Sequence, residues 1–255
     1  GLTQSYFNAF PDQKDIIAVG LERIKPKWLP KDVAFVSCDL TVTNAVQELT
    51  GSLPLASIKS VIISIRPPLV SFRANKQAWM YVEHMLQGLE TVLSQLQPNR
   101  VLHVSSIAAV DHLRRQVLLS EESEAPPCGD LVYPYDRFKR ACEEMVDAMD
   151  AESTNLRLGA IFTDSAQCIQ CASLSLQSYT GPLLSTKIDC NSGRNAAMCR
   201  QALLTTDKPW KPVYYYTRAT KDPVQYGEYL TAYRTAHGMR CFFNLPEIVV
   251  TVSVT

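Results

Sequence analysis

The chain has 255 residues, and its 25 Lys and Arg residues are balanced by 25 Asp and Glu residues, so the net charge is zero. This balance argues against a nucleic-acid partner, because binding to phosphates requires an excess of Lys and Arg. The length suits one large α/β domain or a domain with a small lobe, and 46% hydrophobic residues are enough for a core.

Cysteine usage predicts a cytoplasmic protein. The eight cysteines are scattered, whereas a secreted disulfide framework would be denser in a shorter chain. Cys168 and Cys171 form one CxxC pair, but a zinc site would need a second pair or His partners at ligand spacing, so we expect no metal. No apolar run approaches the ~20 residues of a membrane-spanning helix, and the start of the chain lacks the features of a signal peptide.

The first elements expected along the chain are a helix and four short apolar runs. The helix covers residues 2–10, and a Pro-Asp pair marks its end. Continuous runs rich in β-branched residues are typical of strands that are covered on both faces. The four runs are residues 15–21, 33–38, 61–65 and 101–104.

Helical patterns lie between and after these strands. Residues 79–96 and 138–149 carry apolar side chains at a spacing of three to four, and a further strand is expected at residues 156–162. Strands that alternate with such helices predict a doubly wound parallel sheet, a Rossmann-like α/β fold. We expect this dinucleotide-binding domain to cover residues 1–164.

The last third of the chain is less regular. A helix at residues 194–204, a strand at 212–217 and a helix at 224–237 follow a loop-rich stretch. We expect residues 165–255 to form a smaller substrate-binding lobe that is partly interleaved with the sheet.

The glycine-rich turn of a nucleotide-binding fold is largely missing from this sequence. In such folds the first strand leads into that turn, and the next helix binds pyrophosphate at its N-terminus. Here Gly1 directly precedes the first helix, so only the last glycine of the turn is present. We expect the first strand to be absent and the intact protein to be longer at both ends.

Tyr135 and Lys139 form the strongest candidate for a chemical site. They lie four residues apart at the start of a helix, so they project from one face, and an ammonium near a phenol lowers the pKa of the phenol. Ser105 and Ser106 end a strand that leads to the same edge of a parallel sheet. Taken singly, these residues also fit an amphipathic helix with a surface lysine and serines that cap a turn.

Several motifs, in order, resemble those of the extended short-chain dehydrogenase/reductases, of the NAD-dependent epimerase/dehydratase and 3β-hydroxysteroid dehydrogenase-like type. The matching segments are residues 88–93, 101–107, 121–127, 134–139, 155–162, 188–204 and 212–217. The resemblance implies that Tyr135 is the general acid–base, that Lys139 lowers its pKa and holds ribose hydroxyls, and that Ser106 orients the substrate oxygen. Ser105 is the alternative to Ser106.

The resemblance also implies where the cofactor binds. Glu22 takes the place of the acid that binds the adenosine ribose and favours NAD, while Arg23 leaves NADP open. Asp39 and Leu40 resemble the pair that contacts adenine. The other expected contacts are Gly1 in the turn, Ile65 and Arg66 after a strand, Ser105, and Leu158, Ala160 and Ile161 near the nicotinamide.

Three departures from the family pattern leave two functions open. Arg66 stands where small residues are usual, Met85 replaces a frequent Asn, and Leu158 replaces a Pro. We predict an NAD(P)-dependent oxidoreductase or epimerase/dehydratase that acts on a secondary alcohol or ketone. The alternative is a non-catalytic dinucleotide sensor or scaffold. Steroid, nucleotide-sugar and phenolic substrates all fit the sequence, and a homodimer is left open.

Overall fold

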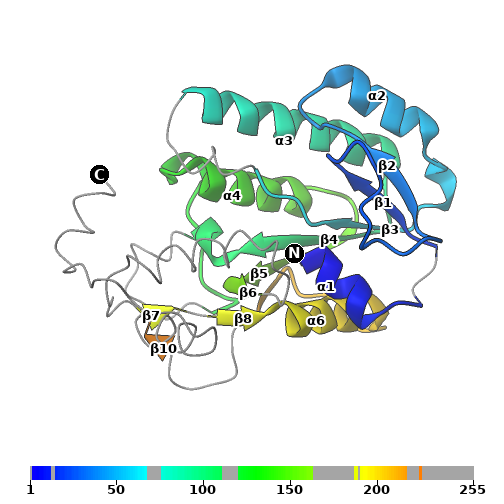
Figure 1. Ribbon diagram of the computed structural model, residues 1–255. Coiled ribbons are helices and arrows are strands. Elements are labelled where there is room, and N and C mark those ends of the chain that lie inside the picture. The colour runs from blue at the N-terminus through cyan, green and yellow to red at the C-terminus, as the bar shows by residue number, and fades with distance from the viewer. Residues whose placement is uncertain are drawn as a thin grey trace, which may run out of the picture. The chain divides into compact units, whose positions relative to one another are not determined.

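A computed structural model describes residues 2–12, 15–67, 76–110, 120–162, 187–188, 190–216 and 224–225 (Figure 1). The chain divides into two compact units. The larger consists of Phe7–Leu158 and Arg200–Tyr216, and the other of Gly1–Tyr6, Gly159–Cys199 and Thr217–Thr255. The division predicted at residue 164 stays a prediction.

The larger unit contains two parallel sheets. Strands β1 (Ile17–Gly20) and β2 (Ala34–Ser37) form the smaller. The other has the order β3-β4-β5-β9, and all of its neighbours are parallel. Its strands are Ser60–Ile63, Arg100–Ser106, Glu152–Leu158 and Val213–Tyr216. The predicted Rossmann-like α/β fold with parallel strands is therefore confirmed.

The predicted single sheet is divided between β1 and β3. In the described part of the chain, β1 pairs only with β2, and β3 pairs only with β4. No strand of the described residues joins the two sheets. The smaller sheet is partly exposed, with Val19 44% accessible, whereas β4 and β5 of the larger sheet are buried over most of their length.

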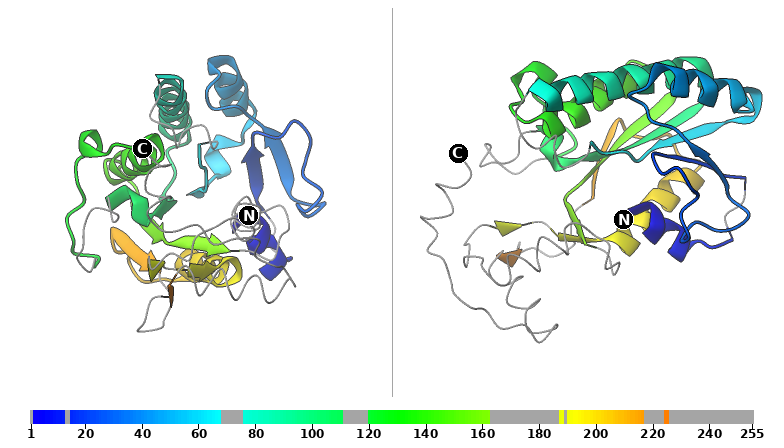
Figure 2. Two further views of the ribbon diagram at one scale, coloured as in Figure 1. Left: turned by 60° about the vertical axis from the view of Figure 1, so that its left-hand side comes forward. Right: turned by 45° about the horizontal axis from the view of Figure 1, so that its top comes forward.

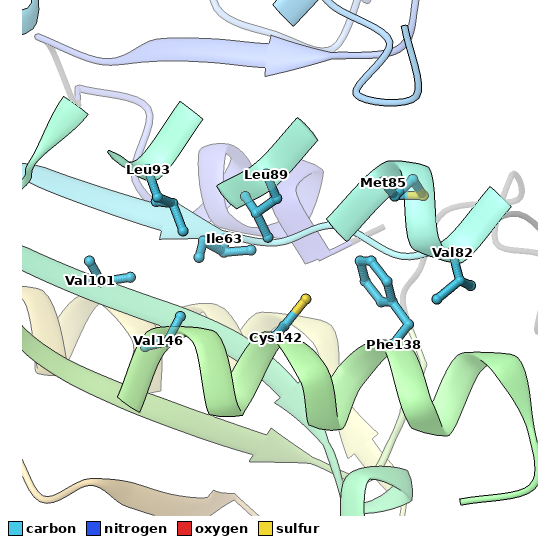
Figure 3. Close-up of a cluster of buried hydrophobic side chains, with 9 residues drawn as sticks. All are labelled: Ile63, Val82, Met85, Leu89, Leu93, Val101, Phe138, Cys142 and Val146. Atoms are coloured by element: carbon cyan, nitrogen blue, oxygen red, sulfur yellow. The ribbon is translucent and has the colours of Figure 1, made fainter. Parts of the chain in front are cut away.

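Helices α3 (Lys76–Leu96) and α4 (Pro134–Asp147) lie over one face of the larger sheet, and α2 (Thr43–Ser52) packs against α3 (Figures 1 and 2). The apolar faces of α3 and α4 meet the sheet in a buried cluster around Phe138, whose ring is fully buried (Figure 3). The cluster consists of Ile63, Val82, Met85, Leu89, Leu93, Val101, Phe138, Cys142 and Val146. Burial of this apolar surface holds both helices on the sheet.

Gly88 of α3 is the point where the loop after β2 touches this helix. A Cβ atom at Gly88 would lie 2.0 Å from the carbonyl oxygen of Leu40. Only glycine permits so close an approach of two backbones. Residues 39–40 are therefore held directly against α3.

The smaller unit contains two short strand pairs. Strand β6 (Ala160–Phe162) is parallel to β8 (Cys190–Ser192), and β7 (Lys187–Ile188) is antiparallel to β10 (Val224–Gln225). Helices α1 (Leu2–Ala9) and α6 (Gly193–Thr205) each contribute residues to both units. Short 3-10 helices occur at Leu55–Ser57, Ile107–Val110 and Cys128–Asp130.

Two predicted elements differ from the structure. The strand expected at residues 156–162 is two strands separated by Gly159, because β5 pairs with β4 and β9 whereas β6 pairs with β8. The helix expected at residues 224–237 is wrong at its start, where Val224, a β-branched residue, pairs in a strand. Its remainder lies outside the described residues. Among those described, no helix is both long and apolar enough to cross a membrane.

Candidate active site

Ser106 and Tyr135 meet in the structure. Ser106 is the last residue of β4, and Tyr135 is the second residue of α4, which begins with a proline where no backbone N–H is needed. The hydroxyl groups of the two side chains hydrogen-bond to each other. The structure thus brings together the serine and tyrosine that the sequence places in one site, and their catalytic roles stay predictions.

Lys139 lies one turn further along α4 and is only 4% exposed. Its ammonium donates to the carbonyl oxygens of Ile65 and Val104, both at 2.8 Å. Burial lowers the pKa of Lys139 to about 8, with Arg66 adding to this and Cys142 and Glu143 opposing it. The third N–H of the ammonium has no partner within the described residues.

The predicted effect of Lys139 on the pKa of Tyr135 stays a prediction. Burial raises the pKa of the Tyr135 phenol above its ordinary value of 10, and the negative charge of Asp136 adds to this. The hydrogen bond with Ser106 and the positive charge of Arg66 oppose the increase. Among the described groups, Arg66 is the cation whose charge lowers the pKa of the phenol, while the Lys139 ammonium is bonded to backbone carbonyls.

Ser105 belongs to a different environment from Ser106. Successive residues of a strand point to opposite faces, and the Ser105 hydroxyl donates to Glu143 Oε1 at 2.6 Å. Ser105 is 4% exposed. The hydroxyl of Ser105 thus contacts Glu143, whereas that of Ser106 contacts Tyr135, and the expected contact of Ser105 with a cofactor stays a prediction.

Glu143 is the centre of a buried polar layer between α4 and the sheet. Arg157 donates to both of its carboxylate oxygens, at 2.9 and 2.7 Å, and also to the Tyr215 hydroxyl at 2.7 Å. Arg140 lies 3.1 Å from Glu143 Oε2. Burial alone raises the pKa of Glu143, but Arg157 and Ser105 outweigh it and hold this pKa below its usual range.

His103 belongs to the same layer. Its Nδ1 lies 2.9 Å from Asn155 Oδ1, and Asn155 donates to Asp147 Oδ1 at 2.8 Å. Burial, helped by the charge of Lys139, lowers the pKa of His103 to about 3, so this ring is neutral. His103 is therefore a neutral residue of the core. No group of three or more potential metal ligands occurs in the described part of the chain.

The residues expected to hold the adenosine follow β1 and β2. The Cys38 N–H donates to the Gly20 carbonyl at 2.8 Å, so the segments after the two strands start at the same edge. Glu22 and Arg23 are exposed there. Asp39 is half-buried, and its Oδ1 accepts from the Thr41 N–H at 2.9 Å and the Thr41 hydroxyl at 2.7 Å.

The remaining predicted residues are placed as follows. Ile65 supplies a carbonyl to Lys139, and Arg66 is exposed. Leu158 is buried at the end of β5, in register with Ser106 on β4. The other residues expected near the cofactor are Ala160 and Ile161, which lie on β6 of the smaller unit, and Gly1, which lies outside the described residues.

Comparison with known proteins identifies the family. Residues 10–167 match the model of the NAD dependent epimerase/dehydratase family, and the chain belongs to this family. The prediction of an NAD-dependent enzyme of the epimerase/dehydratase type is thereby confirmed. No curated protein sequence matches the chain.

Solved structures with low sequence identity share the fold. The Bordetella bronchiseptica enzyme WbmG, in complex with NAD and UDP, has a TM-score of 0.73 at 14% identity, over 96% of this chain and 78% of that one. Thermus thermophilus UDP-glucose 4-epimerase with NAD has a TM-score of 0.72 at 15% identity, over 94% and 81%. TunA, an NAD dependent NDP-hexosamine 5,6-dehydratase, has a TM-score of 0.67 at 13% identity, over 96% and 80%.

The residues of the larger unit fit the cofactor of this family. Lys139 is buried, and one N–H of its ammonium has no partner among the described residues, which suits a hydroxyl of a ribose. Asp39 uses Oδ1 for Thr41 and keeps Oδ2 without a hydrogen bond in the described part of the chain. Asp39 follows the carboxyl end of β2, and Lys139 lies near the start of α4. Ligands of open α/β sheets bind at this edge.

Proposed function

We propose that the protein is an NAD-dependent epimerase or dehydratase that uses Ser106, Tyr135 and Lys139 to act on a secondary alcohol or its ketone. The hydrogen bond between Ser106 and Tyr135, beside a buried Lys139, is the observation that carries the proposal. A hydroxyl pair at a strand end and helix start can hold one substrate oxygen from two sides.

Tyr135 is the group that moves a proton. Because burial raises its pKa, Tyr135 is a protonated phenol at neutral pH, the form that donates to a carbonyl oxygen. In the reverse direction, the phenolate oxygen of Tyr135 takes the proton back as the alcohol is oxidised. Ser106 orients the reacting oxygen, and Lys139 holds a ribose hydroxyl with the N–H that does not donate to the carbonyls of Ile65 and Val104. When bound, NAD exchanges a hydride with the substrate carbon.

A nucleotide sugar is the substrate class we propose. Support comes from the structural neighbours, whose names include a UDP complex, a UDP-glucose epimerase and an NDP-hexosamine dehydratase. Arg66 is exposed close enough to Tyr135 for its charge to act on the phenol, where a cation favours a substrate that carries phosphate.

The test combines a binding assay with a turnover assay. Thermal-shift titration with NAD, NADH, NADP and NADPH reports whether each dinucleotide binds the native state. Turnover is then measured on a panel of UDP-hexoses and UDP-N-acetylhexosamines. We expect a shift with NAD and epimerisation or dehydration of one panel member.

Tyr135→Phe separates chemistry from binding. It removes only the transferable proton, so we expect turnover to fall at least about 100-fold while the NAD shift is retained. Tyr133→Phe is the matched control, because the same change falls on a side chain that is 43% exposed, and it should leave both readouts unchanged. Full turnover by Tyr135→Phe refutes the mechanism. Binding without turnover favours the sensor, and no shift with any dinucleotide refutes both functions.

The cytoplasmic location, the homodimer and the division into a dinucleotide domain and a substrate lobe also stay predictions. Size-exclusion chromatography with light scattering measures the oligomeric state directly, and a monomer at micromolar concentration contradicts the homodimer.

A further inference from the structure

Lys139 and Glu143 are opposite charges one helical turn apart, and both are buried. Their exposed fractions are 4% and 0%. Lys139 has no carboxylate within ion-pair distance in the described part of the chain and is bonded only to backbone carbonyls. Residues four apart on a helix lie on the same face, with Cβ atoms about 5–6 Å apart. Glu143 is therefore the buried carboxylate nearest to Lys139 along α4.

The carboxylate of Glu143 is fixed in place. It accepts from Ser105 on β4 at 2.6 Å and from Arg157 on β5 at 2.9 and 2.7 Å. Arg140, one turn earlier on α4, adds a fourth contact at 3.1 Å. A side chain held from two strands and its own helix cannot move away from Lys139 without breaking these bonds, and an unpaired charge left in the core is costly.

Other charged and titratable groups face this pair from each neighbouring element. Cys142 and Asp147 lie on α4 beside Arg140, His103 lies on β4, and Arg157 lies on β5 with Tyr215 of β9 behind it. Arg66, after β3, adds positive charge near Lys139. Burial keeps His103 neutral and raises the pKa of Cys142 to about 12, so the charged groups among these are Glu143, Asp147 and the arginines.

We propose that Glu143 is a positioning residue for Lys139, and that its fixed carboxylate keeps this buried ammonium charged at neutral pH and so sets the upper pH limit of the site. The charged ammonium donates to the carbonyls of Ile65 and Val104, and a neutral amine would hold them more weakly. The proposal rests on the proposed function, because Lys139 matters for activity only if it serves the Ser106–Tyr135 site.

The test measures the charge of Lys139 directly. The protein is labelled with ¹⁵N,¹³C-lysine, and the Nζ and Cε signals are followed by NMR from pH 6 to pH 11, with Lys139→Met to assign the signal. We expect the titration midpoint of Lys139 to fall by at least one pH unit in Glu143→Gln. Glu144→Gln is the control, because this neighbour has a 42% exposed side chain, and its midpoint should equal that of the wild type.

A double variant keeps the test decisive if Glu143→Gln does not fold. Glu143→Gln with Arg157→Met removes both charges of the buried pair, which restores a neutral layer and often preserves folding. A purely structural role of Glu143 predicts a wild-type midpoint in this variant, whereas the proposal predicts that the lower midpoint persists.

Two outcomes overturn the proposal. One is a wild-type midpoint in either folded variant. The other is failure of both variants to fold, since Glu143 would then be a requirement of the fold itself. The titration needs neither substrate nor NAD. A lowered midpoint in a protein that turns over no substrate would leave the link between Glu143 and Lys139 intact and remove only the proposed function.

Discussion

Replacing Gly88 with alanine tests how the loop after β2 is held against α3. The new Cβ would lie 2.0 Å from the Leu40 oxygen and 2.9 Å from its carbonyl carbon. The first distance is 1.4 Å short of the 3.4 Å at which ordinary contact begins, and both atoms belong to the backbone. Overpacking of this kind costs about 3 kcal/mol at the upper end, and the helix gains about 1 kcal/mol from alanine.

We therefore expect Gly88→Ala to lower the free energy of unfolding by about 2 kcal/mol, measured by urea denaturation. The loop that moves carries Asp39, so the thermal shift with NAD should also decrease. Gly51→Ala is the matched control: Gly51 lies in α2, and a Cβ there meets nothing within 4 Å. It should gain about 0.5–1 kcal/mol from helix propensity. A Gly88→Ala protein as stable as Gly51→Ala would refute the close approach.

Two further predictions concern burial. The pKa of Lys139 is 10.5 in the unfolded chain and about 8 in the folded protein, so between these pH values the unfolded state binds more protons. From pH 8 to 10.5 the free energy of unfolding of the wild type should therefore rise by about 3 kcal/mol relative to that of Lys139→Met. Urea denaturation at both pH values measures this difference. Equal pH dependence in the two proteins would contradict a buried, protonated Lys139. Phe138→Ala should destabilise the fold by about 3–5 kcal/mol, because the ring of Phe138 is fully buried between α3, α4 and the sheet. The control is Met80→Ala, which changes a 46% exposed side chain and should alter stability by less than about 0.5 kcal/mol. Similar losses in the two variants, measured by urea denaturation, would show that the cluster is not the core.

The parallel strands and long helices of the larger unit could be predicted because burial imposes their patterns. The runs around Val36, Ile63 and Leu102 are apolar on both faces, and α3 places Val82, Leu89 and Leu93 on one side. Helix α2 was not predicted from the sequence, because its ten residues are mostly polar and only three of them are buried.

The Ser106–Tyr135 contact could also be predicted, since a strand end and the following helix start share one edge of a parallel sheet. The buried polar layer around Glu143 could not be predicted from the sequence. Charged residues are almost never fully buried unless paired, so Glu143 reads as a solvent-facing residue until its partner is known. Its partner, Arg157, lies on another element, and no local pattern joins the two. The spacing of Lys139 and Glu143 was the one available signal.

The two adjacent serines of β4 have separate structural partners. Ser105 stabilises a buried ion pair through Glu143, whereas Ser106 contacts Tyr135. Ser105 and its partners contribute to the fold, whereas Ser106 and Tyr135 are the pair to which the proposed function assigns the chemistry. If the proposed function holds, replacing Ser105 should cost mainly stability, whereas replacing Ser106 should cost mainly turnover. Ser106 also accepts a hydrogen bond from the Ala108 N–H at 3.2 Å, so it contributes to the turn after β4 as well.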